Sequence, residues 1–173
     1  MISIISGTNR KGSFTESVSR VLASELVQKG IDAQVLSLAQ LPTDFLFSDL
    51  YNHRSEAFEA ILSEFVNPVD KFIFVVPEYN GSYPGVLKVF LESMPPKTWM
   101  DKKALIVGVS DGHAGNLRGQ EHLTGVLHYL KMHVHYNKPK LSSIEKLMNE
   151  NRDGFDERTT SLIDKFLQQT INF

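Results

Sequence analysis

Short apolar runs alternate with amphipathic segments along almost the whole of this chain. Three of the runs, 2–6, 72–76 and 104–109, are apolar nearly throughout and rich in β-branched residues. Strands of this composition are typical of a parallel sheet whose two faces are both covered by helices. The alternation therefore predicts an α/β fold built from right-handed βαβ units, with helices on both sides of the sheet.

Two further strands fit positions nearer the edges of this sheet. Gln34 and Ser37 interrupt the run 33–38, and polar and apolar residues alternate over 133–136, which suits half-exposed strands. Gly30 stands just beyond the first helix, where glycine commonly forms the C-terminal cap. Apolar residues three or four positions apart predict helices over 14–26, 56–65, 85–93, 117–132 and 158–170.

The connection 41–53 is long and carries Phe45, Phe47 and Tyr51. A loop of this kind either fills a gap in the core or forms the wall of a site. We expect the first of these roles, with the aromatic side chains pinning the loop.

Length and composition limit the classes of function that this chain can serve. Its 173 residues correspond to one domain, 1–173, which is long enough to bury a sizeable core. The absence of cysteine excludes disulfides, cysteine nucleophiles and thiolate metal sites, so any redox chemistry must belong to a bound cofactor. With 18 basic and 20 acidic residues, the chain carries no electrostatic signature of nucleic-acid or anionic-membrane binding.

Membrane insertion and export are not indicated by the sequence. No apolar run approaches the roughly 20 residues that a membrane-spanning helix needs. The first strand starts at Ile2 and leaves no room for a leader peptide before it, so we expect a cytoplasmic location.

A polar turn, residues 7–13, directly follows the first strand. Gly7 and Gly12 allow backbone N–H groups to face an anion without interference from a Cβ atom. Ser13 and Glu16 form a capping box for the helix that follows, and the positive end of that helix dipole points at the turn. The turn therefore suits a phosphate group.

The same turn also allows other interpretations. Gly7 can simply turn the chain and Ser13 can simply cap the helix, whereas Arg10 or Lys11 would add charge for a phosphate. A Walker A loop is excluded because Ser13 occupies the position of its lysine, and the G-x-G-x-x-G fingerprint of dinucleotide-binding folds is absent. A hydroxyl-rich turn fitted to a terminal monophosphate remains.

Two more turns follow the third and fourth strands at the same edge of the predicted sheet. Residues 77–85 contain Asn-Gly and Pro-Gly pairs, so this turn is rigid and exposes its backbone. It suits the pyrimidine edge of an isoalloxazine ring, with Tyr79 or Tyr83 as a flat contact, although both tyrosines can equally be ordinary loop anchors. Residues 110–116 form a third, glycine-bearing turn, and open parallel sheets bind ligands at this edge.

These three turns resemble segments of the flavodoxin-like NAD(P)H-dependent FMN reductase family, which includes quinone, chromate and azo-dye reductases. Residues 7–13 resemble its phosphate loop G-S-x-R-x-x-S, and residues 77–88 are similar to its P-E-Y-N-x-S-x-P-G-x-L-K signature almost letter for letter. Residues 112–118 resemble its third segment, G-x-x-G-G-x-R. The resemblance implies a three-layer sandwich with a five-stranded parallel sheet of order 2-1-3-4-5 that binds FMN.

The resemblance also assigns individual residues to the cofactor, because each matches a position of a family motif. These are Thr8, Arg10, Ser13, Phe14 and Thr15 at the phosphate and ribityl end, Pro77, Glu78, Tyr79, Asn80, Gly81 and Ser82 at the isoalloxazine, and Ser110, Gly112 and Gly115 on the other side of the ring.

The chain departs from the family pattern at several positions. Thr8 replaces a serine but keeps the hydroxyl, and Thr15 replaces a frequent asparagine, which weakens one cofactor contact. Asn116 replaces a glycine of the third segment, so the backbone approach to the ring is lost or remodelled there. Val89 and Glu92 stand where the family usually has asparagine and aspartate, on a helix that commonly packs subunits together.

The activity implied by the resemblance is hydride transfer from NADPH or NADH to bound FMN, and then to a quinone, azo, metal-oxyanion or free flavin acceptor, in a ping-pong mechanism. No protein side chain is catalytic, because the chemistry occurs on the flavin, whose reduced ring is stabilised by backbone N–H groups of residues 79–82. The expected partners are a small-molecule acceptor and further copies of the chain in a homodimer or homotetramer.

The sequence also allows two other functions. One is a flavodoxin-type FMN electron carrier, although such carriers are usually strongly acidic and this chain has a formal net charge of -2. The other is a flavodoxin-like binding module that has lost its flavin affinity, an idea motivated by Thr15 and Asn116.

Some charged and titratable residues have two interpretations. His128, His133 and His135 superficially suggest metal ligands, but no cysteine or nearby carboxylate completes a set, so we expect polar edge residues and no metal. Arg10 or Lys11 can contact the 2′-phosphate of NADPH, or can be solvated surface charges.

Overall fold

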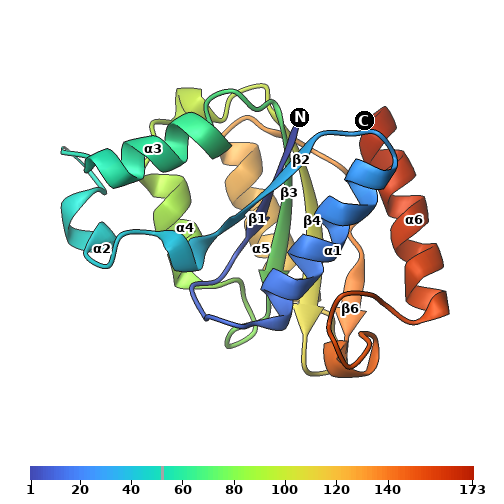
Figure 1. Ribbon diagram of the computed structural model, residues 1–173. Coiled ribbons are helices and arrows are strands. Elements are labelled where there is room, and N and C mark those ends of the chain that lie inside the picture. Colours follow the sequence, from blue (N-terminus) through green and yellow to red (C-terminus); the bar gives the residue numbers. More distant parts are fainter. Residues whose placement is uncertain (52) are drawn as a thin grey trace.

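Strands and helices alternate along the chain in a computed structural model that describes residues 1–51 and 53–173 (Figure 1). The strands are β1 Ile2–Ser6, β2 Ala33–Ser37, β3 Lys71–Pro77, β4 Lys103–Ser110, β5 His133–Val134 and β6 Lys140–Ser142. The helices are α1 Phe14–Gln28, α2 Phe45–Ser48, α3 Glu56–Phe65, α4 Gly85–Glu92, α5 Leu117–Tyr129 and α6 Glu157–Asn172, with 3-10 turns η1 Leu38–Gln40, η2 Pro96–Thr98 and η3 Ile144–Lys146.

The strands form a parallel sheet in the order β2-β1-β3-β4-β5, which confirms the predicted order 2-1-3-4-5. Ile4 of β1 lies opposite Val35 of β2 on one side and Ile73 of β3 on the other. The chain therefore leaves β1 in one direction to form β2 and returns to the other side of β1 to form β3. This reversal opens a crevice at the carboxyl ends of β1 and β3, where sheets of this type bind ligands.

The fifth strand is broken, which the sequence prediction of a single strand over 133–136 missed. Val134 pairs with Ala104 of β4, and pairing resumes only where Lys140 lies opposite Gly108. Between these two pairs, the segment from Val134 to Lys140 contains two more residues than the matching stretch of β4. The extra residues bulge away from the sheet. Pro139 ends this bulge, since its carbonyl oxygen accepts the Gly108 N–H at 2.9 Å. Its missing N–H removes no ladder bond there.

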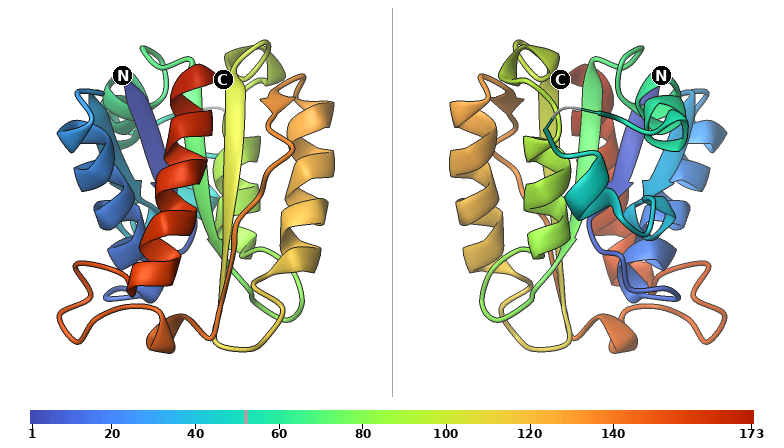
Figure 2. Two further views of the ribbon diagram at one scale, coloured as in Figure 1. Left: turned by 90° about the vertical axis from the view of Figure 1, so that its right-hand side faces the viewer. Right: turned by 90° about the vertical axis from the view of Figure 1, so that its left-hand side faces the viewer.

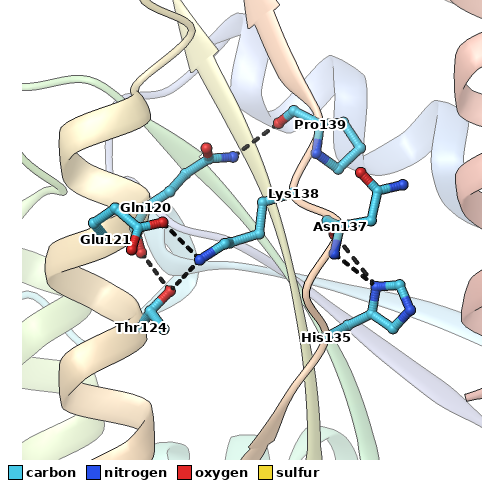
Figure 3. Close-up of polar contacts among 7 residues, drawn as sticks. All are labelled: Gln120, Glu121, Thr124, His135, Asn137, Lys138 and Pro139. Carbon is cyan, nitrogen blue, oxygen red and sulfur yellow. Dashed lines mark hydrogen bonds and ion pairs between the residues drawn. The ribbon is translucent and has the colours of Figure 1, made fainter.

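Side chains of α5 hold the bulge in place (Figure 3). Gln120 donates from Nε2 to the carbonyl oxygen of Pro139 at 2.8 Å, while Lys138 Nζ donates to Glu121 Oε1 at 2.7 Å and to Thr124 Oγ1 at 3.1 Å. The break between β5 and β6 is therefore an ordered feature, since its polar groups have fixed partners.

Helices cover both faces of the sheet, as predicted: α1 and α6 lie on one face, and α3, α4 and α5 lie on the other (Figures 1 and 2). Successive strand residues point to opposite faces. Accordingly Ile4 and Ile73 belong to the core beneath α1 and α6, whereas Ile5 and Phe74 belong to the core beneath α3, α4 and α5. Two buried faces explain why these strands are apolar throughout.

Local signals define the ends of α1. Ser13 Oγ accepts the Glu16 N–H at 3.2 Å, but the Glu16 carboxylate pairs with Arg20 at 2.6 Å, so only half of the expected capping box forms. Gly30 has φ 77° and donates to the carbonyl of Val27 at 2.9 Å, which confirms its capping role.

The long connection contains α2, and one aromatic side chain anchors it. The Phe45 ring is buried and lies 4.8 Å from the Phe58 ring of α3, between centroids. Phe47 and Tyr51 are 91% and 80% exposed, so they do not pin the loop as expected. Residue 52 of this connection lies outside the described residues. None of the described helices has both the length and the apolar character that crossing a membrane demands.

Candidate functional site

The turns after β1, β3 and β4 meet at the carboxyl edge of the sheet, the lower edge in Figure 2. Together they enclose a cavity of about 350 Å³. Its lining comes from the first turn and the start of α1, from the ends of β3 and β4, and from the segment after β6: Arg10, Lys11, Gly12, Ser13, Phe14, Thr15, Pro77, Glu78, Tyr79, Val109, Ser110, Asp111, Ile144, Glu145 and Arg152.

The first turn presents backbone donors to this cavity. Within the described part of the chain, the N–H groups of Gly12, Ser13, Phe14 and Thr15 have no acceptor, and all four residues line the cavity. Those of Ser13, Phe14 and Thr15 are among the donors that the start of a helix leaves unpaired. Unpaired N–H groups and the helix dipole together favour an anion here.

Gly7 does not take part in this donor set, although we expected it to. Its N–H donates to the carbonyl oxygen of Val75 at 2.8 Å, and a Cβ atom at this position would lie 2.9 Å from the same oxygen. Gly7 is therefore needed because the turn lies against β3, and the expectation that its N–H faces an anion is wrong. Gly12, in contrast, has φ 66°, a left-handed conformation that favours glycine.

A pair of hydroxyl groups joins the first turn to the second. Thr8 Oγ1 lies 2.8 Å from the hydroxyl of Tyr79 and accepts the Arg10 N–H at 3.2 Å. The Thr8 side chain is buried. Its hydroxyl is therefore used to fix the Tyr79 ring at the wall of the cavity.

The second turn is a tight hairpin. Tyr79 and Ser82 exchange backbone hydrogen bonds of 2.9 and 3.0 Å, and the two residues between them, Asn80 and Gly81, have φ 51° and 76°. Asn-Gly is the favoured pair for such positive φ values. The other predicted ring contact, Tyr83, packs against the core under α4, and burial raises the pKa of its hydroxyl.

The third turn faces this hairpin across a second cavity of about 320 Å³. Ser110 Oγ accepts the Gly115 N–H at 2.9 Å and donates to the carbonyl oxygen of Gly112 at 2.8 Å, which holds the turn in one shape. Glu78, Ser110 and Asp111 line both cavities. The two cavities are therefore neighbours along one groove.

The NADPH-dependent FMN reductase family matches residues 1–142 of the chain. The chain belongs to this family. The probable NADPH:quinone oxidoreductase 2 of Oryza sativa subsp. japonica is 34% identical over 148 residues, which are 81% of this chain and 70% of that protein. An NAD(P)H-dependent FMN reductase of Pseudomonas aeruginosa is 32% identical over 174 aligned positions, which cover 95% of this chain and 89% of that protein.

The fold of this family member also agrees with solved structures. FerB, a flavoenzyme NAD(P)H:(acceptor) oxidoreductase from Paracoccus denitrificans, superposes with a TM-score of 0.82 at 21% identity, over 99% of this chain and 94% of that one. The resemblance found in the sequence, the flavodoxin-like fold and the assignment as an oxidoreductase that uses FMN and NAD(P)H are thereby confirmed.

Most of the residues that the family motifs assign to the cofactor lie along the groove. Arg10, Ser13, Phe14, Thr15, Pro77 and Tyr79 line the first cavity alone, Asn80, Gly81 and Gly112 line the second alone, and Glu78 and Ser110 line both. Thr8, Ser82 and Gly115 line neither cavity. Their groups bond within the protein: Thr8 to Tyr79, the Gly115 N–H to Ser110, and the Ser82 hydroxyl to His122 Nδ1 of α5 at 2.9 Å.

Asn116 has a structural use that the family pattern does not indicate. Its backbone is left-handed, with φ 59°, and its buried side chain donates from Nδ2 to the carbonyl oxygens of Val76 and Pro77, both at 3.0 Å. Asn116 Oδ1 has no partner in the described part of the chain. The residue therefore fastens the start of α5 to the end of β3, directly before the hairpin.

The sequence analysis of this reductase missed the three cavity residues that follow β6: Ile144, Glu145 and Arg152. They come from the segment between β6 and α6, which passes beneath the start of α1 (Figure 2). The polar run 149–154 could be recognised as a turn from its Asn, Asp and Gly residues. No local signal indicates that this turn returns to the first one.

The histidines lie in separate environments. His133 is exposed, 4.0 Å from Asp101 Oδ1 through Nε2, whereas His135 is buried beyond the end of β5. The two residues thus differ in burial, although their N–H groups donate in the same pattern to the carbonyls of Lys102 and Ala104, both at 2.9 Å. His135 Nδ1 accepts the Asn137 N–H at 3.2 Å (Figure 3). Across residues 1–51 and 53–173, no three histidine, aspartate or glutamate side chains gather as a metal site would require.

Proposed function

We propose that this protein is an NAD(P)H-dependent FMN oxidoreductase that reduces a quinone. Its FMN would lie along the groove, with the phosphate at the first turn and the isoalloxazine between the second and third turns. The observation that carries this proposal is the continuity of the two cavities, which share Glu78, Ser110 and Asp111. All the turns belong to one sheet, so the binding function would reside in one domain, 1–173.

The first cavity fits the phosphate and ribityl end of FMN. Residues 12–15, whose N–H groups have no acceptor among the described residues, line this cavity, and Arg10 and Lys11 add positive charge at the same end. Oriented backbone donors and cations are what a phosphate dianion requires. Glu78 and Asp111 belong to the stretch that the two cavities share, so these two carboxylates lie toward the ring end of the groove.

The second cavity fits the polar edge of a flat heterocycle. The hairpin uses the N–H groups of Tyr79 and Ser82 internally, and those of Asn80 and Gly81 have no acceptor among the residues that the structure describes. Asn80 and Gly81 line the second cavity. Their N–H groups are available to hydrogen-bond a ring and to stabilise negative charge that develops on it.

The chain's own contribution to the reaction is binding and orientation. When bound, FMN supplies hydride acceptance from NAD(P)H and hydride delivery to the acceptor. The hairpin and the third turn hold one edge of the ring, and no side chain has to act as acid or nucleophile. Both substrates would react in turn at this one bound group, which supports a ping-pong mechanism. The quinone acceptor is proposed from the rice relative, which is named as a quinone oxidoreductase.

The test begins with FMN titration followed by anaerobic addition of NADPH or NADH. We expect flavin fluorescence to be quenched at micromolar protein, the yellow colour to bleach with the coenzyme, and the colour to return on addition of 1,4-benzoquinone. Initial rates measured against the coenzyme concentration, at several fixed quinone concentrations, should give parallel lines in a double-reciprocal plot.

Each competing function gives a different result in the same experiment. An electron carrier would bind FMN without bleaching by either coenzyme, and a binding module that has lost the flavin would cause no quenching. Intersecting lines would contradict the ping-pong mechanism while leaving the reductase activity in place. The homodimer or homotetramer and the cytoplasmic location stay predictions.

A further inference from the structure

Arg152 lies at the phosphate end of the groove but comes from the far end of the sequence. It follows residue 142, where the match to the family ends, and it lines the first cavity together with Arg10 and Lys11. Its position is therefore a property of this chain that the family motifs do not describe.

The turn that carries Arg152 is well ordered. The Asn149 side chain accepts the Asp153 N–H at 3.1 Å and donates to Asp153 Oδ1 at 2.7 Å, and Met148 forms a bridge with Phe155. Arg152 has φ 57° and donates its N–H to the carbonyl of Asn149 at 3.0 Å. This closed turn presents the arginine side chain toward α1.

The guanidinium group is fixed by two contacts with the first turn. Its Cζ lies 3.9 Å from the centroid of the Phe14 ring, and its Nη1 donates to the carbonyl oxygen of Gly12 at 3.3 Å. Gly12 and Phe14 flank Ser13 and line the same cavity as Arg152, so the cation lies at the end of the cavity that residues 12–15 form. A guanidinium has five N–H donors, and stacking on a ring leaves its edge accessible.

We propose that Arg152 binds the phosphomonoester of the ligand held in this cavity. This inference rests on the proposed function, since it assumes that a phosphate occupies the first turn. A planar guanidinium matches phosphate oxygens in a bidentate manner. Because its two contacts already order the side chain, binding loses less conformational freedom than with a mobile lysine.

The charges of the cavity explain why an additional cation matters. Glu145 lines the first cavity beside Arg10 and Lys11, and its carboxylate offsets part of their charge. Arg10, Lys11 and Arg152 are all exposed. Arg152 is the cation that the structure holds directly against the first turn, through Gly12 and Phe14.

Two phosphomonoesters are relevant to such a reductase, the 5′-phosphate of FMN and the 2′-phosphate of NADPH. Arg152 contacts the residues that carry the unpaired N–H groups, so we assign it to the FMN phosphate. The experiment separates the two sources by comparing FMN with riboflavin, and NADPH with NADH.

The variants are Arg152→Gln, Arg152→Lys and, as a matched control, Arg158→Gln. Arg158 is exposed in the first turn of α6 and loses the same charge, but it does not line the cavity. We expect Arg152→Gln to raise the FMN Kd about 10- to 100-fold, the range for losing a charge-assisted hydrogen bond. The riboflavin Kd should stay unchanged, because riboflavin has no phosphate.

Arg152→Lys and Arg158→Gln separate the role of the guanidinium group from that of positive charge in general. Arg152→Lys should recover part of the FMN affinity, and Arg158→Gln should leave both Kd values within about twofold of wild type. If Arg152→Gln left the FMN Kd unchanged but lowered the ratio of kcat/KM for NADPH to that for NADH, Arg152 would still bind a phosphate. That phosphate would then be the 2′-phosphate of NADPH, and the assignment to FMN would be wrong. Equal changes for FMN and riboflavin, or no change in any of these quantities, would overturn the proposal. Wild type that binds neither flavin would overturn the proposed function as well.

Discussion

Asn116 illustrates how one side chain can connect two parts of the site. It occupies a left-handed position, and its amide holds the last two carbonyls of β3, those of Val76 and Pro77. Gly119 lies directly beneath this side chain, since a Cβ there would be 2.1 Å from Asn116 Oδ1. Where the family motif has glycine, the asparagine therefore adds two hydrogen bonds between the start of α5 and the end of β3.

Replacing Asn116 should destabilise the protein in a graded way. Asn116→Gly keeps the left-handed backbone but removes two buried hydrogen bonds, so we expect a loss of about 1–2 kcal/mol in the free energy of unfolding. Asn116→Ala removes the same bonds and adds roughly 1 kcal/mol of strain at positive φ. Urea unfolding at neutral pH measures both. A glycine variant as stable as wild type would show that these bonds contribute nothing.

Residue roles set by near neighbours could be predicted from the sequence, and long-range roles could not. Ser13 caps α1 and Asn80-Gly81 form the hairpin because each role depends on a few adjacent residues. Thr8 was expected to face a phosphate, yet its hydroxyl bonds to Tyr79, which is 71 residues away. Arg152 contacts Gly12 across 140 residues, a separation that no local pattern records.

At the scale of elements, α6 closes the face that it shares with α1 and is fastened at both ends. Asp156 caps its start, where the carboxylate accepts the N–H and the hydroxyl of Thr159, both at 2.9 Å. At its end, Lys71 Nζ donates to the carbonyl oxygen of Thr170 at 2.8 Å. Desolvation lowers the pKa of Lys71. Both anchors use charged groups, so the docking of this helix depends on pH.

The cap at Asp156 gives a specific pH dependence. The Thr159 N–H stabilises the carboxylate and holds the pKa of Asp156 below its usual value. Because the folded-state pKa is lower than the unfolded one, this stabilisation is complete above about pH 4 and is lost as the pH falls through the folded-state value. Asp156→Ala should cost about 0.5–2 kcal/mol at pH 7 and less at pH 2.5.

Asp156→Asn is the matched control for this helix cap. Asparagine caps helices about as well as aspartate but does not titrate, so the stability of this variant should fall less between pH 5 and pH 2.5. Chemical unfolding of the three proteins across this range provides the measurement. Parallel pH profiles for wild type and Asp156→Asn would contradict the assigned role of the carboxylate.

Elements with strong periodicity were predicted almost to the residue, whereas the broken strand was not. Helix α3 was expected over 56–65 and is Glu56–Phe65, because its apolar residues recur at helical spacing over this range. The strand expected over 133–136 ends at Val134 and restarts at Lys140. Its pairing depends on bonds from α5 to the bulge at Pro139, which are tertiary contacts.

At the scale of the whole molecule, strand order assembles the site. Turns that start near residues 7, 77 and 110 meet because β1, β3 and β4 are parallel neighbours whose carboxyl ends share one edge. The sequence could predict this convergence, since it follows from the fold class. It could not predict that the segment after β6 also reaches that edge, because its path depends on how α6 packs against α1.

A ligand that bridges these turns should stabilise the entire fold. Residues 12–15, 77–81 and 110–114 come together only when the sheet is formed, so FMN should bind the native state and not the unfolded chain. At 100 times its Kd, such a ligand adds about 2.7 kcal/mol to the free energy of unfolding. For a chain of this length each kcal/mol raises Tm by about 2–4 °C, so thermal denaturation should show one transition shifted by about 5–11 °C. Riboflavin at the same concentration should shift Tm less, because it lacks the phosphate, but should match FMN at equal multiples of its own Kd. If FMN left Tm unchanged, or if a second transition appeared that FMN did not shift, the ligand would not link the turns of β1, β3 and β4.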